Sequence, residues 1–292
     1  MSASSRTVNG FRLAFDRFGS ENRESVVLLH GWPGNRRDYR LVVPRLADVA
    51  DVVVPDLRGF GESDKHLLEP RQFYTADAQA RSVAALIDEL GLERVVVGGY
   101  DIGSRIAQAL AHRLPGRIVG LVLSPPLPGV GDRILREPAQ REFWYQAFHQ
   151  LDLIEDLVDA KPTAVRAYLR HFWDHWSGPG FRLSDADLNR LAAEYEAPGA
   201  FTASIAWYRA GAGTVAHSLG EHTPNPAERT AVPTRVLWPR HDPLFPPDWA
   251  DRLNEYFSDV TVKFCSGAGH FTPLECPADF AELVRGFLSP AP

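Results

Sequence analysis

The sequence predicts an α/β fold, in which a mostly parallel central sheet is flanked by helices and interrupted by an all-helical insertion. Three observations predict it. Short runs of β-branched residues alternate with helical patterns between residues 25 and 123, which is typical of a parallel sheet. The alternation then stops, and residues 133–219 have helical patterns rich in Phe, Trp and Tyr. Two further strand-like runs, residues 234–237 and 260–264, follow this block and return the chain to the sheet.

The chain is expected to divide into three consecutive segments. Residues 1–127 form the first part of the core, residues 128–226 form a helical cap, and residues 227–292 form the second part of the core. A proline-rich stretch at 124–129 and the segment 224–229 mark the two junctions. A chain of 292 residues is long enough for one large core and a smaller subdomain of this kind.

Composition restricts the class of protein and its partners. The chain is 45% hydrophobic and 23% charged, as ordinary globular proteins are, and its formal net charge of -6 argues against a nucleic-acid partner. No run approaches the roughly 20 apolar residues of a membrane helix, and the first residues lead into no signal-peptide core, so we expect a cytoplasmic protein without a membrane partner. Cys265 and Cys276 have no metal-ligand neighbours in the sequence and are expected to be unpaired thiols.

Residues 99–103, Gly-Tyr-Asp-Ile-Gly, have the Gly-x-nucleophile-x-Gly layout of a strand-to-helix elbow, with aspartate where serine is usual. A β-branched run at 94–98 precedes this elbow, and helical spacing follows it over residues 104–114. The two glycines allow a strained turn and close packing of the helix against the strand. A carboxylate here indicates alkylation rather than acylation, so Asp101 is the expected nucleophile. Taken alone, the pattern is equally an ordinary turn, and the assignment depends on further signals.

The loop after the strand-like run 25–29 supplies one such signal. Its sequence, His-Gly-Trp-Pro-Gly at 30–34, lies past the carboxyl end of a strand, where open α/β sheets bind ligands. The backbone N–H groups of Trp32 and Ile102 are predicted to form the pair of donors that stabilises an oxyanion. His30 is a candidate for substrate binding, with bracing of the loop as its alternative.

The acid and the histidine of a catalytic triad are expected in two late loops. Asp242 follows the strand-like run 234–237, and His270 follows the run 260–264. Together with Asp101 they give the chain order nucleophile, acid, histidine, which is the order found in α/β-hydrolases.

These motifs resemble those of the α/β-hydrolase superfamily from about residue 10 to residue 288. The resemblance implies the α/β-hydrolase fold, with the helical cap lying over the nucleophile. An aspartate nucleophile narrows the resemblance to epoxide hydrolases, haloalkane dehalogenases and fluoroacetate-type dehalogenases. It also implies that Asp101, Asp242 and His270 act without a metal or an organic cofactor.

The residue after the nucleophile helps to separate these families. In the resembled haloalkane dehalogenases this residue is commonly tryptophan, and in fluoroacetate-type enzymes it is arginine, which suits a substrate carboxylate. Here it is Ile102, which offers only its backbone. An epoxide instead requires an acid above the ring oxygen, and tyrosine serves because its pKa of about 10 keeps it protonated at neutral pH.

Two cap segments resemble those that carry the ring-opening tyrosines of epoxide hydrolases, and they point to Tyr145 and Tyr208. Their neighbours Trp144 and Trp207 are expected to contact the substrate. The segment of Tyr208 also resembles a halide-binding segment of fluoroacetate-type dehalogenases, and a one-residue shift in alignment would exchange Tyr145 for Trp144. Both tyrosines could equally be ordinary core aromatics.

We therefore predict an epoxide hydrolase that works through a covalent aspartyl ester. Asp101 attacks an epoxide carbon while Tyr145 and Tyr208 hydrogen-bond the departing oxygen. His270, oriented by Asp242, then activates a water that hydrolyses the ester. The aromatic cap predicts a small apolar or aromatic epoxide as the substrate, and the sequence does not indicate an oligomeric state. The alternatives are a haloacid or haloalkane dehalogenase with the same triad, and a non-catalytic ligand-binding member of the fold.

Overall fold

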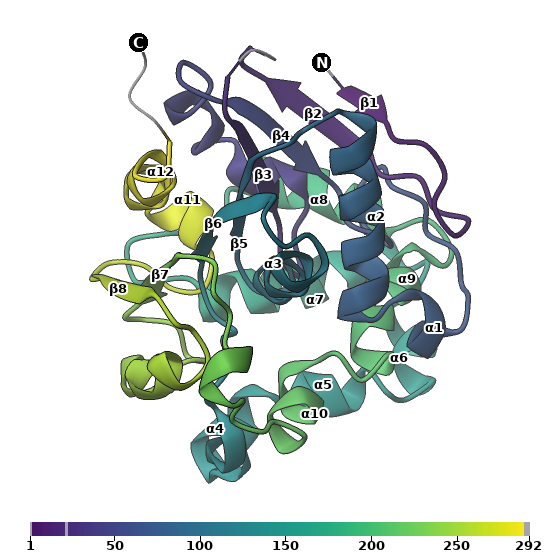
Figure 1. Ribbon diagram of the computed structural model, residues 1–292. Helices are drawn as coiled ribbons and strands as arrows, with labels where there is room; N and C mark the ends of the chain where they lie inside the picture. The colour runs from purple at the N-terminus through teal and green to yellow at the C-terminus, as the bar shows by residue number, and fades with distance from the viewer. Residues whose placement is uncertain (1, 21–22, 289–292) are drawn as a thin grey trace.

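A computed structural model describes residues 2–20 and 23–288 and has a central sheet covered by helices (Figure 1). Within these residues the sheet has eight strands in the order β1-β2-β4-β3-β5-β6-β7-β8. The strands are β1 (Ser2–Ser4), β2 (Ala14–Phe18), β3 (Ser25–Leu29), β4 (Asp51–Pro55), β5 (Val95–Gly99), β6 (Ile118–Leu123), β7 (Thr234–Pro239) and β8 (Val260–Cys265). β2 pairs antiparallel with β1 and β4, and all neighbours from β4 to β8 pair in parallel. The predicted α/β class with a mostly parallel sheet is confirmed.

Two features of the sheet are not predicted by the sequence analysis. The antiparallel strands β1 and β2 precede residue 25, where the predicted strand-like runs begin. In addition, the connection from β3 to β4 contains only two short 3-10 helices, η1 (Arg36–Tyr39) and η2 (Val43–Arg45), instead of an α-helix. Pro33 lies before η1 and Pro44 lies inside η2, and proline interrupts the backbone hydrogen bonding of a continuous helix.

Helices cover both faces of the sheet, and two adjacent glycines identify the faces. Gly98 and Gly99 are consecutive in β5, so Cβ atoms added to them would point to opposite faces. A Cβ at Gly98 would lie 3.1 Å from a phenylalanine ring of α12 (Pro277–Arg285), whereas a Cβ at Gly99 would lie 2.5 Å from the backbone of α3 (Ile102–Arg113). α3 packs in turn against α2 (Ala76–Glu89). α2 and α3 therefore lie on one face, and α12 lies on the other.

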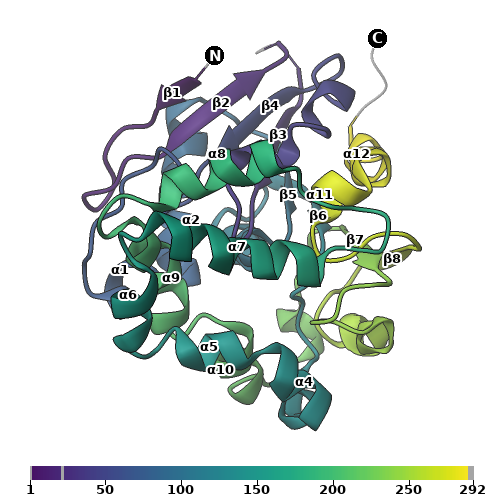
Figure 2. The ribbon, with the colours of Figure 1, turned by 180° about the vertical axis from the view of Figure 1, so that it is seen from behind.

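Between residues 128 and 226, all of which the structure describes, the cap contains helices and no strand (Figure 2). Its helices are η3 (Gly131–Leu135), α4 (Glu137–Glu142), α5 (Trp144–Phe148), α6 (Leu153–Val158), α7 (Pro162–Trp176), α8 (Asp185–Tyr195), α9 (Ala200–Arg209) and α10 (Thr214–Leu219). α7 buries an apolar stripe at helical spacing, composed of Val165, Leu169, Phe172, Trp173 and Trp176. The stripe attaches the cap to the core. The Trp173 ring stacks on the Phe271 ring with 3.7 Å between their centroids, and Nε1 of Trp173 donates to the Pro33 carbonyl.

The remaining short helices lie outside the cap or at its end. They are α1 (Pro70–Phe73), η4 (Pro226–Glu228), η5 (Pro247–Glu255) and α11 (Thr272–Glu275). Among residues 2–20 and 23–288, none of the helices combines the length and apolar character that a bilayer span requires.

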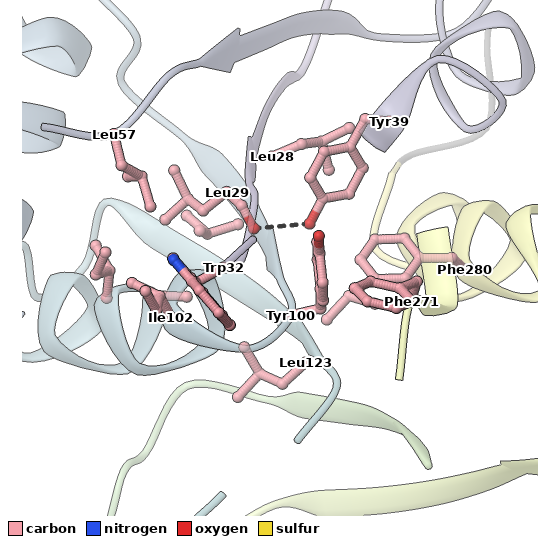
Figure 3. Close-up of a cluster of buried hydrophobic side chains, with 14 of the residues drawn as sticks. Leu28, Leu29, Trp32, Tyr39, Leu57, Tyr100, Ile102, Leu123, Phe271 and Phe280 are labelled. Carbon is pink, nitrogen blue, oxygen red and sulfur yellow. Dashed lines mark hydrogen bonds between the residues drawn. The ribbon is translucent and has the colours of Figure 1, made fainter. Parts of the chain in front are cut away.

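Aromatic and aliphatic side chains together fill the core beneath the loops at the carboxyl end of the sheet (Figure 3). Tyr39 is fully buried, donates its hydroxyl proton to the Leu29 carbonyl at 2.8 Å, and packs against Phe280 of α12. Tyr100 lies between Tyr39 and Phe271, with ring centroids 6.3 and 6.4 Å away. Because Tyr100 directly precedes Asp101, this packing fixes the backbone from which the predicted nucleophile projects.

Candidate active site

Asp101 occupies a strained turn between β5 and α3. Its φ of 48° and ψ of -126° lie outside the regions that L-residues usually adopt, so the surrounding structure must hold the turn. Gly103 allows the turn to form, because a Cβ there would lie 2.0 Å from the Leu29 carbonyl oxygen. Gly31 allows the facing loop to approach, because a Cβ there would lie 2.5 Å from the Asp101 Cβ. The loop after β3 and the elbow after β5 therefore meet at the Asp101 side chain.

The two oxygens of the Asp101 carboxylate have different neighbours. Oδ2 accepts a hydrogen bond of 2.7 Å from the backbone N–H of Trp32. Ile102 is the first residue of α3, so its N–H has no carbonyl acceptor within the helix. Oδ1 faces the imidazole of His270, with 3.7 Å between Oδ1 and Nε2. One oxygen thus lies at a backbone donor and the other lies toward the histidine.

Asp242 fixes the orientation of the His270 ring. The distance from His270 Nδ1 to Asp242 Oδ2 is 2.8 Å, and Oδ1 of Asp242 accepts the Leu244 N–H at 2.9 Å. Both side chains are buried. Within the part of the chain that the structure describes, Nε2 of His270 has no hydrogen-bond partner. The structure therefore brings Asp101, Asp242 and His270 together, with one imidazole nitrogen held by a carboxylate and the other available near Asp101.

The charges around His270 favour its protonated form. Burial by itself lowers the pKa of the imidazole, but the carboxylates of Asp242 and Asp101 outweigh this effect and raise the pKa of His270 to about 10. At neutral pH the imidazole therefore carries a proton while both carboxylates face it. Loss of the negative charge on Asp101 would lower the pKa of His270.

Glu275 organises the loop that carries His270, and it was not among the predicted site residues. Its carboxylate accepts three backbone N–H groups, from Gly178 (2.7 Å), Gly269 (2.8 Å) and Phe271 (2.9 Å). The His270 N–H itself donates to the carbonyl of Trp176 in the cap at 2.8 Å. The histidine loop is thus attached to the cap as well as to the core. Hydrogen bonds to backbone groups leave no side-chain pattern, so the sequence offered no signal for this role.

Tyr145 of α5 and Tyr208 of α9 meet beside Trp32. Their ring centroids are 5.5 Å apart, and they lie 5.7 and 5.9 Å from the Trp32 ring. Since Trp32 also binds the Asp101 carboxylate through its N–H, both phenols belong to the surroundings of the nucleophile. Burial raises the pKa of each tyrosine well above its usual value, and the negative charge of Asp101 raises it further. Both phenols therefore keep their protons at neutral pH.

The structure distinguishes Tyr145 from its neighbour Trp144. Tyr145 is 2% exposed, whereas Trp144 is 42% exposed. Trp144 lines a cavity of about 420 Å³ in the cap, together with Gln146 and Tyr208. Tyr145 is therefore the residue that packs against Trp32 within reach of the charge of Asp101, whereas Trp144 lies at the wall of this cavity.

Two other predicted substrate contacts lie apart from the catalytic group. His30 is fully buried, its Nδ1 donates to the Gly31 carbonyl, and its Nε2 accepts the Leu57 N–H, so the side chain braces the loop and offers no ring nitrogen to a ligand. Trp207 is buried in α9, and consecutive helical residues point about 100° apart, so it does not share the direction of Tyr208. Within the described ranges, Trp207 takes no part in the ring contacts around Trp32.

Two further aromatic residues pack beside the His270 ring. Trp176 of α7 lies 5.2 Å from both the His270 ring and the Tyr145 ring, and Phe245 stacks near His270 at 6.3 Å. Phe245 was absent from the predicted site, although its place three residues after Asp242 in the same loop was a usable signal. These rings make the surroundings of the triad largely apolar.

A second carboxylate lies behind the elbow and was also not predicted. The Tyr100 hydroxyl donates to Asp38 at 2.6 Å, and Tyr100 lies 6.1 Å from the His270 ring. Burial raises the pKa of Asp38 to about 7 despite this hydrogen bond. The residue before the nucleophile is therefore anchored by a buried polar contact.

The structure adds one neighbour to the two thiols. Cys265 and Cys276 are free and buried, as predicted, but Asp279 brings a carboxylate to within 4.8 Å of both sulfur atoms. The expectation that the cysteines lack metal-ligand company was therefore incomplete, because Asp279, three residues after Cys276, completes such a group with Cys265. Asp279 is also paired with Lys263 at 2.8 Å. This group does not include any residue of the triad.

Comparison with known proteins agrees with this geometry. Residues 24–277 match the family model described as the alpha/beta hydrolase fold. The soluble epoxide hydrolase of Corynebacterium sp. (strain C12) is 28% identical over 97% of this chain and 96% of that protein, and epoxide hydrolase 4 of Homo sapiens is 27% identical over 96% of this chain and 76% of that protein. The crystal structure of wild-type Cfl2 from Burkholderia cenocepacia superimposes with a TM-score of 0.84 at 28% identity, over 99% of this chain and 95% of that one. The chain belongs to the α/β-hydrolase fold family, and its sequence is similar to those of epoxide hydrolases.

Proposed function

We propose that this enzyme opens an epoxide to a vicinal diol through a covalent ester on Asp101. The observation that carries the proposal is the convergence of two buried, protonated phenols with a carboxylate that faces a histidine. Epoxide opening requires a nucleophile on one side of the ring and a proton donor at the ring oxygen. Asp101 supplies the first, and Tyr145 and Tyr208 supply the second. The similarity to named epoxide hydrolases supports the same reaction.

In the first step, Oδ1 of Asp101 attacks an epoxide carbon and the bond from that carbon to the ring oxygen breaks. The departing oxygen takes a proton from one of the two phenols, which their raised pKa values keep protonated until then. Oδ2 remains at the Trp32 N–H and becomes the carbonyl oxygen of the ester. Formation of the ester removes the negative charge that faces His270, so the pKa of His270 falls. The imidazolium then passes its proton to the phenolate, and the neutral imidazole can act as a base.

In the second step, Nε2 of His270 takes a proton from a water molecule, and the resulting hydroxide attacks Cγ of the ester. The oxyanion forms on Oδ2, where the Trp32 N–H and the N–H of Ile102 at the start of α3 stabilise it. Collapse breaks the bond between Cγ and Oδ1, and the diol oxygen takes the proton from His270. The second proton of the water, left on the Asp101 carboxyl group, passes to His270 and restores the carboxylate and the imidazolium, so one water is consumed for each diol.

The substrate class follows from the walls of the site. Trp32, Phe172, Trp176 and Phe245 surround the tyrosines and His270, which suits an apolar or aromatic epoxide. Ile102 offers only its backbone, so the position after the nucleophile supplies no side-chain donor for a halide. This favours an epoxide over a carbon–halogen bond.

A substrate comparison tests the proposal. The purified protein is incubated with styrene oxide, and separately with fluoroacetate and bromoacetate, and the products are measured as diol and as released halide. We expect diol from styrene oxide above the rate in an Asp101→Asn control. Halide release without diol formation would identify a dehalogenase, and no product from any of these substrates would favour a ligand-binding protein.

A further inference from the structure

Tyr145 is followed by a glutamine that holds its hydroxyl group. Gln146 is 6% exposed, and its Nε2 donates to the Tyr145 hydroxyl oxygen at 3.1 Å. An amide N–H can only donate, so the phenol oxygen must act as the acceptor in this contact. The single proton of the phenol is therefore left for another acceptor.

The orientation of the Gln146 amide is fixed from its other end. Oε1 accepts the backbone N–H of Val215, just inside α10, at 3.0 Å. A backbone N–H cannot accept a hydrogen bond, so a flipped amide would place two donors against each other and is excluded. The backbone also approaches closely at Gly213, where an added Cβ would lie 2.7 Å from Oε1. Gln146 is thus clamped between α10 and Tyr145.

The hydroxyl proton of Tyr145 can point toward the side on which Asp101 and Tyr208 lie. Gln146 donates to the Tyr145 hydroxyl oxygen, and the Tyr208 phenol lies beside the same oxygen and also favours its acceptor role. The Tyr145 ring lies against Trp32, whose N–H binds Asp101, and against Tyr208. Gln146 also opposes the effect of burial on Tyr145, since a donated hydrogen bond favours the phenolate and lowers the pKa of the phenol.

We infer that Gln146 is a positioning residue that compels Tyr145 to donate its proton toward the substrate oxygen. This inference rests on the proposed function, because it assigns a role in ring opening. Gln146 does not itself touch the reacting atoms. It acts by occupying the acceptor site of the phenol, so that the proton is already directed when the substrate binds.

Substitution by glutamate tests the direction of the hydrogen bond with almost no change in shape. In Gln146→Glu one carboxylate oxygen can still accept the Val215 N–H, while the other now accepts the proton of Tyr145 and withholds it from the substrate. We expect ester formation at saturating styrene oxide to slow by about tenfold or more, approaching the loss in Tyr145→Phe. Rapid quench and intact mass measure this rate in a His270→Gln background, where the ester accumulates. Gln140→Glu is the matched control, since it adds the same charge to a cap glutamine whose side chain, among the residues that the structure describes, bonds to the Ile134 carbonyl and not to a tyrosine.

A double-mutant cycle separates positioning from mere stabilisation of the cap. If Gln146 acts through Tyr145, Gln146→Glu causes no further loss once Tyr145 is replaced by Phe. The rate of ester hydrolysis, measured with His270 intact, should also be unchanged, because Tyr145 does not act in that step. A loss that is equal in both backgrounds, or an unchanged rate of ester formation in Gln146→Glu, would overturn the inference.

A second variant covers a failure to fold, and a separate outcome distinguishes failure of this inference from failure of the proposed function. Gln146→Met removes the donor without adding charge, and it takes the place of Gln146→Glu if the glutamate variant does not fold. It is expected to slow ester formation in protein that retains Tyr145 and to have no effect in Tyr145→Phe protein. The proposed function fails in a different way, because His270→Gln protein would then form no ester with any epoxide. Ester formation that depends on Tyr145 but not on Gln146 would leave the function intact and reject only the positioning role.

Discussion

The imidazole of His270 and the carboxylate of Asp101 face each other across 3.7 Å, and neither is bridged to the other by a normal hydrogen bond. At this distance the charge of the carboxylate controls the proton on the imidazole, while a water molecule can still approach both. The same carboxylate is the group that loses its charge when it is alkylated. The two catalytic steps are therefore linked, because the first step changes the basicity of the residue that the second step requires.

Replacement of Asp101 by asparagine should abolish turnover and leave the fold intact. The amide is nearly isosteric but a poor nucleophile, so we expect a loss on the order of 10⁴-fold or more in diol formation. Turnover is measured together with circular dichroism and intact mass, because slow deamidation would restore aspartate. Near-normal activity in protein whose mass remains that of the amide would contradict the assignment.

The pKa of His270 should fall in the same variant. In the parent the imidazole titrates near pH 10, because the two carboxylates outweigh the effect of burial. Asp101→Asn removes one of these charges, so the imidazole should release its proton at lower pH, which NMR of labelled histidine can follow. The raised pKa stabilises the folded parent below pH 6.5, and this contribution is lost as the pH rises toward 10. Urea denaturation at pH 7 and pH 10 should therefore show a smaller decrease in the free energy of unfolding for Asp101→Asn than for the parent. An equal decrease in both proteins would argue against coupling of Asp101 and His270.

Tyr145 and Tyr208 should act in ring opening and in no other step. Replacing either with phenylalanine should slow ester formation, within about the 10² to 10⁴-fold range of general acids, and replacing both should nearly stop it. Ester hydrolysis should keep its rate. Tyr168→Phe is a control, since the Tyr168 hydroxyl lies 3.0 Å from His149 Nε2 and the residue is also a cap tyrosine. A double variant that opens epoxides at the parental rate would place the acid elsewhere and support a dehalogenase.

Local sequence patterns predicted the parts of the site that are built from backbone turns. The elbow around Asp101 and the loop around Trp32 follow buried strands, and parallel strands bring their carboxyl ends to one edge, so their proximity could be inferred without a structure. The same reasoning placed Asp242 after β7 and His270 after β8, and the structure has Oδ2 of Asp242 2.8 Å from Nδ1 of His270.

Contacts that join distant segments could not be inferred in this way. Glu275 binds backbone N–H groups of the cap and of the histidine loop, and no side-chain pattern records backbone donors. The direction of each cap aromatic was equally out of reach, because α5 is a single short helix in which Trp144 and Tyr145 are both aromatic. Only tertiary packing decides that Tyr145 is buried and Trp144 is not.

Glu275→Gln should weaken the attachment between the histidine loop and the cap. The carboxylate satisfies three N–H donors, whereas the amide has one oxygen and would turn its NH₂ group toward one of them. We expect a loss of about 1–3 kcal/mol in the free energy of unfolding, measured by urea denaturation, and slower ester hydrolysis with less effect on ester formation. Glu282→Gln, which removes an exposed partner of Lys263, should change neither rate. Parental stability and hydrolysis in Glu275→Gln would show that the loop is held by other contacts.

His270→Gln should separate the two chemical steps. The histidine is required to activate water but not to ionise Asp101, so the variant should attack the epoxide and then stall as the ester. We expect one stoichiometric burst of epoxide consumption and a protein mass raised by that of the substrate, located on the peptide that contains Asp101. An enzyme with a serine nucleophile requires its histidine in the first step and would accumulate no adduct. A dehalogenase would stall in the same way, but only with a halogenated substrate and with release of halide. If the variant forms no adduct with a broad set of epoxides and haloacids, the covalent mechanism is wrong and the protein binds its ligand without converting it.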